Sequence, residues 1–142
     1  MPDAKIVPEL YCSDLLTSLG FYVELLGFAV VYDRPEESFA FLDLEGAHIM
    51  LVESSEQTEG ERVWWTGNPE KPYGRGMNLQ IEVRDVDGVC QRLSDADWPL
   101  FRPMEEKWYR KQDFEVGNRQ FLAQDPDGYL LRFFSDLGRR PL

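Results

Sequence analysis

The hydrophobic and polar positions in the first half of the chain alternate, change to helical spacing and then alternate again. Residues 6–12 alternate, and Ser13 and Asp14 then form a helix start signal. Apolar side chains recur at helical spacing up to Gly27, at Leu15, Leu16, Leu19, Tyr22, Leu25 and Leu26. Strand-like runs follow at 28–33, 38–44 and 47–53, separated by a polar turn at 34–37 and a Glu45-Gly46 turn. The pattern predicts the order βαβββ.

The second half repeats this order. We expect strands at 77–83, near 100–106, at 114–124 and at 129–135, with a helix at about 86–96 and a frayed tail at 139–142. The strand-to-helix junction at Asp14 recurs at Asp85, an offset of 71 residues, and the turn at Gly46 recurs at Gly128, an offset of 82. The difference of 11 places an insertion in the second half. A duplicated unit implies a core shared between the copies, so we expect one domain over 1–142, made of a module at 5–53, a linker at 54–76 and a module at 77–135.

Composition narrows the partners. The chain has 26 acidic and 15 basic residues and a net charge of −11, which disfavours nucleic acid and anionic membranes and favours cationic or neutral ligands, although solubility alone explains it equally well. There is no apolar run of about 20 residues, and residues 1–5 lack the apolar stretch of a signal peptide, so we expect a cytoplasmic protein. Cys12 and Cys90 are expected to be buried thiols.

Two stretches carry a family resemblance. Residues 18–28 read Ser-Leu-Gly-Phe-Tyr-Val-Glu-Leu-Leu-Gly-Phe, and 125–132 read Asp-Pro-Asp-Gly-Tyr-Leu-Leu-Arg. From about Ile6 to Ser135 the chain resembles the glyoxalase/bleomycin-resistance/extradiol-dioxygenase superfamily, also called vicinal oxygen chelate. The resemblance implies an α+β fold, in which two βαβββ modules curl a mixed sheet into a cup that a homodimer completes.

Strand parity predicts which side chains face this cup. A helix needs an apolar floor, so Leu79, Ile81 and Val83 should lie under the second helix while Asn78, Gln80 and Glu82 face the cup. The hairpin strands should present the alternate residues His48, Met50, Val52, Leu130, Arg132 and Phe134 on the same face.

Metal-dependent members of the resembled family place one His, Gln or Glu on each of four strands. Matching motif by motif carries these places to Val7, Met50, Asn78 and Arg132. None is a usual ligand for a divalent ion, and a guanidinium would repel one, so we expect no metal and no cofactor. An unorthodox site of His48 with Glu9 and Glu82 stays open, as does a polar network of Arg132 with these two carboxylates.

The arginine of the Asp-Pro-Asp-Gly-x-Leu-Leu-Arg stretch also resembles metal-free bleomycin-resistance proteins. This resemblance implies a binding protein that sequesters an antibiotic with flat heteroaromatic rings and a cationic end, for which aromatic planes beside carboxylates are suited. The expected ligand-binding residues are Glu9, Tyr11, Tyr32, Phe39, Phe41, His48, Met50, Trp65, Gln80, Glu82, Trp108 and Arg132.

Other interpretations remain. The loop aromatics Trp64, Trp65, Trp108 and Tyr109 would equally suit a dimer interface, and the cationic segment 107–111 suits an anionic group better than a cationic drug. The alternative function is an enzyme of the same superfamily, a lyase, isomerase or oxygenase, with a displaced metal site or with Glu9 or Glu82 as a general base. Phe21, Tyr22, Phe28, Phe121 and Phe133 are predicted core residues.

Overall fold

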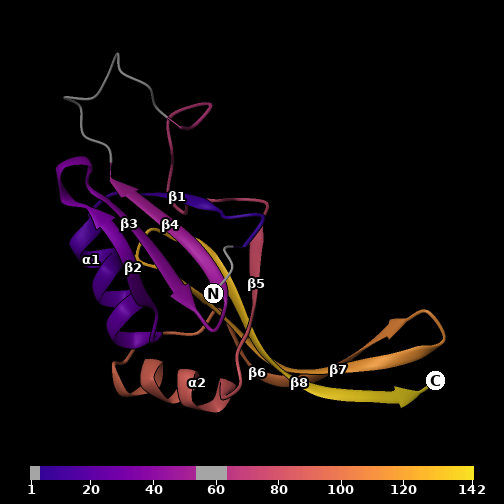
Figure 1. The fold of residues 1–142 in the computed structure, drawn as a ribbon. Helices are drawn as coiled ribbons and strands as arrows, with labels where there is room; N and C mark the ends of the chain where they lie inside the picture. The colour runs from indigo at the N-terminus through magenta and orange to yellow at the C-terminus, as the bar shows by residue number, and fades with distance from the viewer. Residues whose placement is uncertain (1–3, 54–63) are drawn as a thin grey trace. The chain divides into compact units, whose positions relative to one another are not determined.

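The computed structural model describes residues 4–53 and 64–142, which divide into two compact units. The first unit is formed by the chain up to Arg75 together with Asp125–Tyr129, and the second by Gly76–Gln124 and Leu130–Leu142. Residues 1–3 of the N-terminal segment and 54–63 of the expected linker lie outside the described residues. Each unit contains one four-stranded sheet (Figure 1).

The two units repeat one topology. In the first, the elements are β1 (Glu9–Cys12), α1 (Leu15–Leu19), the π-helix η1 (Gly20–Leu25), β2 (Ala29–Arg34), the 3-10 helix η2 (Pro35–Glu37), β3 (Phe39–Leu44) and β4 (Ala47–Glu53). In the second they are β5 (Asn78–Glu82), α2 (Val86–Asp95), β6 (Arg102–Lys111), β7 (Phe114–Gln124) and β8 (Leu130–Pro141). The strand orders are β1-β4-β3-β2 and β5-β8-β7-β6, with β1 parallel to β4, β5 parallel to β8 and the other pairs antiparallel. The predicted repeat of βαβββ and the α+β class are confirmed.

Equivalent aspartates begin the two main helices. Asp14 Oδ1 accepts hydrogen bonds from the backbone N–H groups of Leu16 and Thr17, and Asp85 Oδ1 accepts one from Gly88. Such caps satisfy donors that have no partner within the first helical turn. The first helix differs from the expected single α-helix, because α1 continues as a π-helix in which the Leu26 N–H reaches the Phe21 carbonyl.

Side chains on the helix-facing side of each sheet form the core. In the first unit Leu10 is 2% exposed, and the alternate residues Glu9 and Tyr11 are more accessible. In the second unit Ile81 is 4% exposed and Val83 is 2% exposed, while Glu82 between them is exposed. The predicted strand parity is therefore confirmed. The five aromatic residues predicted to be core, Phe21, Tyr22, Phe28, Phe121 and Phe133, are all buried.

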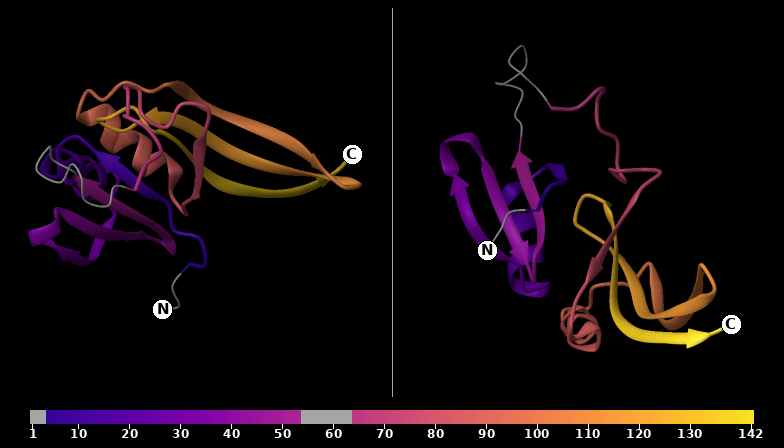
Figure 2. Two further views of the ribbon diagram at one scale, coloured as in Figure 1. Left: turned by 90° about the horizontal axis from the view of Figure 1, so that it is seen from above. Right: turned by 45° about the vertical axis from the view of Figure 1, so that its right-hand side comes forward.

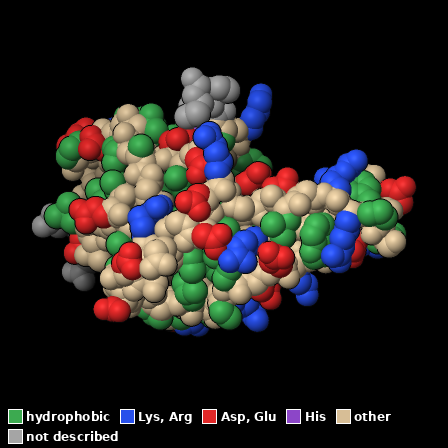
Figure 3. All heavy atoms as spheres, turned by 90° about the horizontal axis from the view of Figure 1, so that it is seen from below, with side chains coloured by type: hydrophobic (Ala, Val, Ile, Leu, Met, Phe, Trp, Pro, Cys, Tyr) green, Lys and Arg blue, Asp and Glu red, His purple; other side chains and the backbone are tan. Residues whose placement is uncertain are grey.

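The second unit extends into a three-stranded arm, which we define as residues 107–116 and 136–141 (Figure 2). The expected insertion loop is wrong, because Trp108 and Tyr109 lie inside β6 rather than between strands. The expected frayed tail is also wrong. Arg140 is paired with Glu115 in the β7–β8 ladder, and the two side chains form an ion pair of 2.8 Å. On the face shown in Figure 3, charged side chains of both signs and apolar side chains follow one another along the arm.

The turn between β7 and β8 belongs to the first unit and carries two buried carboxylates. Asp127 accepts hydrogen bonds from the Ser13 N–H at 3.0 Å and from the Ser13 hydroxyl at 2.5 Å. Asp125 Oδ2 accepts the Tyr22 hydroxyl proton at 2.8 Å. Gly128 has a φ of +101°, and a Cβ there would lie 2.5 Å from the Pro72 Cβ. Only glycine suits this position.

Candidate ligand-binding site

The four positions matched to metal ligands hold the residues Val7, Met50, Asn78 and Arg132 on or next to the strands β1, β4, β5 and β8. Met50 is paired with Glu9 across β1 and β4, and Asn78 with Leu130 across β5 and β8. Within residues 4–53 and 64–142 no three side chains of His, Cys, Asp or Glu gather closely enough to hold a metal ion. By their chemistry the residue types at these four positions do not fit a hard or borderline divalent ion, because valine has no donor atom, methionine only a soft sulfur, and arginine is a cation.

His48 uses both ring nitrogens within its own unit. Nδ1 accepts a hydrogen bond from the Ala4 N–H at 3.0 Å, so the proton lies on Nε2, which is 3.0 Å from Asp43 Oδ1. The side chain is buried, and its ring meets Phe41 edge-on. Because neither nitrogen lone pair is available, His48 is a buried structural residue of β4 and does not fit an unorthodox metal site.

An aromatic group lies on the neighbouring strands β2 and β3 of the first unit. Tyr32 on β2 stacks on Phe41 of β3 with ring centroids 5.0 Å apart and an interplanar angle of 15°. Phe39 lies next to Phe41 on the same face and carries the Arg34 guanidinium 4.0 Å above its ring. Phe39 and Phe41 are buried, whereas Tyr32 is 46% exposed. Of these three aromatic rings, Tyr32 is therefore the one that a ligand can reach.

A second aromatic group of the first unit surrounds Tyr11. The Tyr11 ring lies 4.7 Å from Trp65 and 5.6 Å from Tyr73, between centroids. Trp64 is 68% exposed.

Glu9, the other predicted residue of β1, has a pKa that is raised by desolvation and partly lowered again by the charge of Arg34, although its side chain is exposed.

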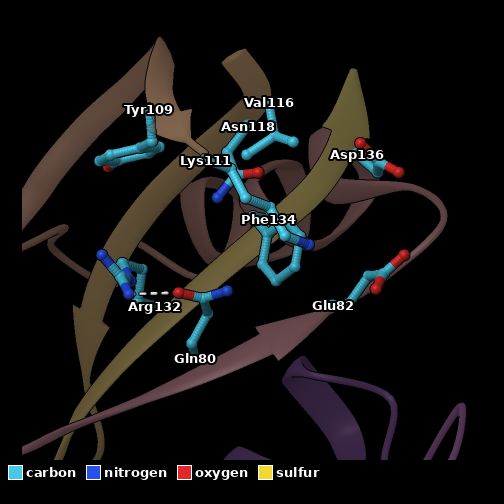
Figure 4. Close-up of a pocket in the computed structure, with 9 residues that line it drawn as sticks. All are labelled: Gln80, Glu82, Tyr109, Lys111, Val116, Asn118, Arg132, Phe134 and Asp136. Carbon is cyan, nitrogen blue, oxygen red and sulfur yellow. Dashed lines mark hydrogen bonds between the residues drawn. The ribbon is translucent and has the colours of Figure 1, made fainter. Parts of the chain in front are cut away.

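The second unit has a pocket of about 370 Å³ on its concave face (Figure 4). It is open to solvent, and its lining combines charged, amide and aromatic side chains. The lining residues are Gln80, Glu82, Tyr109, Lys111, Val116, Asn118, Arg132, Phe134 and Asp136. The structure therefore brings together three of the predicted ligand-binding residues, Gln80, Glu82 and Arg132.

Arg132 is held by an amide rather than by a carboxylate. Its Nη2 donates a hydrogen bond to Gln80 Oε1, which is the residue opposite it in the β5–β8 register (Figure 4). Its Nε is buried and has no hydrogen-bond partner among the described residues. Of the network of Arg132 with Glu9 and Glu82 that the sequence left open, no ion pair to either carboxylate forms within the described residues, and Gln80 is the partner of the guanidinium there.

Trp108 lies on the other face of β6 from the pocket residue Tyr109. Its indole ring covers Gly117, where a Cβ would be 2.7 Å away, and Arg140 lies 4.2 Å from the ring. The pocket residues Tyr109, Lys111, Asn118 and Asp136 were not predicted. Alternation along β6 would have identified Tyr109 and Lys111 if the strand had been extended to Lys111.

Comparison with known proteins agrees with this fold. The chain is 28% identical over 142 residues to a bleomycin resistance protein of Geobacillus stearothermophilus, covering 92% of this chain and 96% of the relative. A crystal structure of TioX from Micromonospora sp. ML1 has a TM-score of 0.71 at 24% identity, covering 94% of this chain and 99% of the other. A protein of unknown function from Agrobacterium tumefaciens str. C58 also has a TM-score of 0.71, at 26% identity, covering 96% and 97% of the two chains.

The family assignment covers most of the chain. The sequence profile described as Glyoxalase/Bleomycin resistance protein/Dioxygenase superfamily matches residues 6–133, which include both βαβββ units except residues 134–141 of β8. No helix in the described ranges has the length and apolar character needed to cross a membrane. With the repeated topology and the matched profile together, the chain belongs to the glyoxalase/bleomycin resistance protein/dioxygenase superfamily.

Proposed function

We propose that this protein is a metal-independent binding protein that sequesters a small aromatic or cationic antibiotic of the bleomycin type. The observation that carries the proposal is Arg132, a guanidinium on the concave face at a position matched to a metal ligand. A permanent cation there opposes a divalent ion and favours an organic ligand with its own hydrogen-bonding groups. The similarity to a bleomycin resistance protein supports the same conclusion.

The ligand would use carboxylates and an exposed aromatic plane. Glu82 and Asp136 in the pocket form no ion pair within the described part of the chain, so both can receive a cation. Phe134 in the pocket offers a flat apolar surface, as Tyr32 does in the first unit. The proposal includes a homodimer, which size-exclusion chromatography with light scattering would detect.

Isothermal titration calorimetry with metal-free and copper-loaded bleomycin tests the proposal. We expect saturable heat with the wild-type protein and a Kd raised about 10- to 100-fold by Glu82→Gln, since a charge-assisted hydrogen bond is worth about 1.5–3 kcal/mol. Glu106→Gln is the matched control, because Glu106 lies on β6 outside the pocket and faces Arg119. The absence of heat beyond dilution with both forms of the drug would overturn the proposal.

The enzymatic alternative has one observation in its favour, the raised pKa of Glu9, since a carboxylate with a raised pKa can act as a general base. Elemental analysis of protein purified without chelator separates the two functions. Stoichiometric zinc, iron or manganese would favour the enzyme, and its retention in Glu9→Gln would show that the metal does not depend on this carboxylate.

A further inference from the structure

The pocket of the second unit has charges of opposite sign at opposite ends. Figure 4 shows Arg132 and Tyr109 on one side and Glu82 and Asp136 on the other. Lys111 also lines the pocket and lies between these two sides in Figure 4, beside Phe134, so the lining carries two cations and two carboxylates. A pocket of this composition favours a ligand with no net charge but with separated charges of its own.

Arg132 supplies the first donor at the basic end. Its Nη2 is engaged by Gln80, which fixes the plane of the guanidinium. Its Nε–H group is buried and lacks an acceptor within residues 4–53 and 64–142. Because a guanidinium carries five N–H donors, Arg132 has donors besides the one given to Gln80 with which to bind a ligand oxygen in the pocket.

Tyr109 supplies the second donor, and a short hydrogen-bond chain determines its direction. Gln120 Nε2 donates to Glu105 Oε1 at 3.2 Å and to the Tyr109 oxygen at 2.7 Å. A carboxylate only accepts hydrogen bonds, so Glu105 keeps the amino group of the amide on its side. The Tyr109 oxygen therefore acts as an acceptor toward Gln120, and its own proton is available for a ligand. Gln120 is 3% exposed, which holds the amide in this orientation.

The spacing of the two ends suits a ligand built on one aromatic ring. Gln80 and Glu82 are two residues apart on the same face of β5, which separates them by about 7 Å. Arg132 is paired with Gln80 and Phe134 with Glu82, so the phenyl ring lies beside the path between the donor end and the acidic end. Aromatic rings pack with their centroids about 4.5–7 Å apart, so a ligand ring that lies on Phe134 would lie between the donor end and the acidic end of the pocket.

We propose that the pocket binds a zwitterionic aromatic ligand. Its carboxylate accepts hydrogen bonds from the Arg132 guanidinium and the Tyr109 hydroxyl, its ring packs on Phe134, and its cationic group lies between Glu82 and Asp136. Glu105 and Gln120 are positioning residues, since they act through Tyr109. The inference rests on the proposed function in using the same pocket, and it adds a carboxylate to the cationic and aromatic groups of the ligand.

Three matched probes test this proposal on the full-length, ¹⁵N-labelled protein. They are 4-(aminomethyl)benzoate, its methyl ester, which keeps only the cation, and its N-acetyl derivative, which keeps only the carboxylate. Binding is followed by the backbone NMR shifts of the pocket residues. We expect the zwitterion to bind at least about tenfold more tightly than either singly charged analogue, which is the loss expected for one charge-assisted hydrogen bond.

Variants assign the ends of the ligand. Tyr109→Phe and Glu105→Gln should weaken the binding of the two probes that carry a carboxylate about threefold or more and leave the binding of the ester unchanged. Glu82→Gln should instead weaken the binding of the two probes that carry a cation, the zwitterion and the ester. Glu106→Gln should change the binding of none of the three. The proposal fails if the ester binds as tightly as the zwitterion, if Tyr109→Phe weakens all three probes equally, or if no pocket resonance shifts.

The same experiment separates this inference from the proposed function. If the zwitterion binds in the pocket and bleomycin gives no heat, the proposed zwitterionic ligand class stands and the proposed antibiotic function fails. If bleomycin binds and Glu82→Gln weakens that binding, but the three probes bind equally well, the antibiotic function stands and only the proposed zwitterionic ligand class fails.

Discussion

Asp125 gives the sharpest test of the energetics of this fold, through replacement by asparagine. The residue is 3% exposed. Its Oδ1 accepts the N–H groups of Asp127 at 2.9 Å and Tyr129 at 3.0 Å, and its Oδ2 accepts the Tyr22 hydroxyl. Despite these donors, desolvation raises the pKa of Asp125 from 3.8 to about 6. Ionisation of this group therefore opposes folding at neutral pH.

The size and sign of the effect follow from linkage. A rise of about two pKa units corresponds to about 3 kcal/mol, at about 1.4 kcal/mol per unit. Because the folded pKa lies above the unfolded one, this stabilisation is fully present below about pH 4 and is lost as the pH rises through 6. Asparagine keeps an oxygen for the two backbone donors, offers its amide to the Tyr22 oxygen and does not ionise. Relative to wild type, the stability of Asp125→Asn should increase by about 2.4 kcal/mol between pH 4 and pH 7.

Urea denaturation followed by circular dichroism, at intervals from pH 4 to pH 8, measures this difference. Subtracting wild type from variant cancels the titration of the other carboxylates. Asp113→Asn, at an exposed position in the β6–β7 turn, is the control for removing a carboxylate from an accessible site. A constant difference between Asp125→Asn and wild type across pH 4–7 would refute the reasoning, since it would mean that the buried carboxyl titrates alike in both states.

Three further outcomes are expected. Gly117→Ala should cost about 1–3 kcal/mol in wild type, because its Cβ would meet the Trp108 ring at 2.7 Å, and the cost should largely disappear in a Trp108→Ala background in a urea-denaturation double-mutant cycle. Gly128→Ala combines a φ of +101° with a backbone neighbour at 2.6 Å and should lower stability by at least about 2 kcal/mol in the same assay; an unchanged midpoint would contradict this. Cys12, buried and with its pKa raised by desolvation to about 12, should be alkylated at least about 1000-fold more slowly in the native protein than after denaturation, whereas the half-buried Cys90 should react first, as peptide mass spectrometry would record.

Local sequence signals predicted the fold where one interaction decides the structure. Asp14 and Asp85 marked both helix starts because a side-chain cap acts within one turn. Alternation assigned the faces of β5 and β8 because one side must cover a helix. The π-helical continuation after Leu19 could not be predicted, since it depends on how Phe21 and Tyr22 pack.

The limits of sequence reasoning were greatest in the arm and the pocket. The ladder that holds Arg139 and Arg140 joins residues distant in sequence, so no local pattern distinguishes it from a polar tail. The β6–β7 ladder likewise extends β6 to Lys111 and places Tyr109 in the pocket with Arg132. Arg132 was identified by its motif, but its partner Gln80 could be chosen over Glu82 only once the register of β5 and β8 was known.

The turn at Asp125–Tyr129 limits how the gene could be divided or recombined. The first unit consists of the chain up to Arg75 and of the five residues Asp125–Tyr129, which lie within the sequence of the second unit. A cut after Arg75 would therefore leave these five residues on the fragment that carries the second unit. A fragment ending at Arg75 would lack the acceptors of Ser13 and Tyr22. A chimera that takes its first module from a relative should therefore also take residues 125–129 from that relative. Although the two modules have the same topology, they cannot be exchanged as two continuous pieces of the gene.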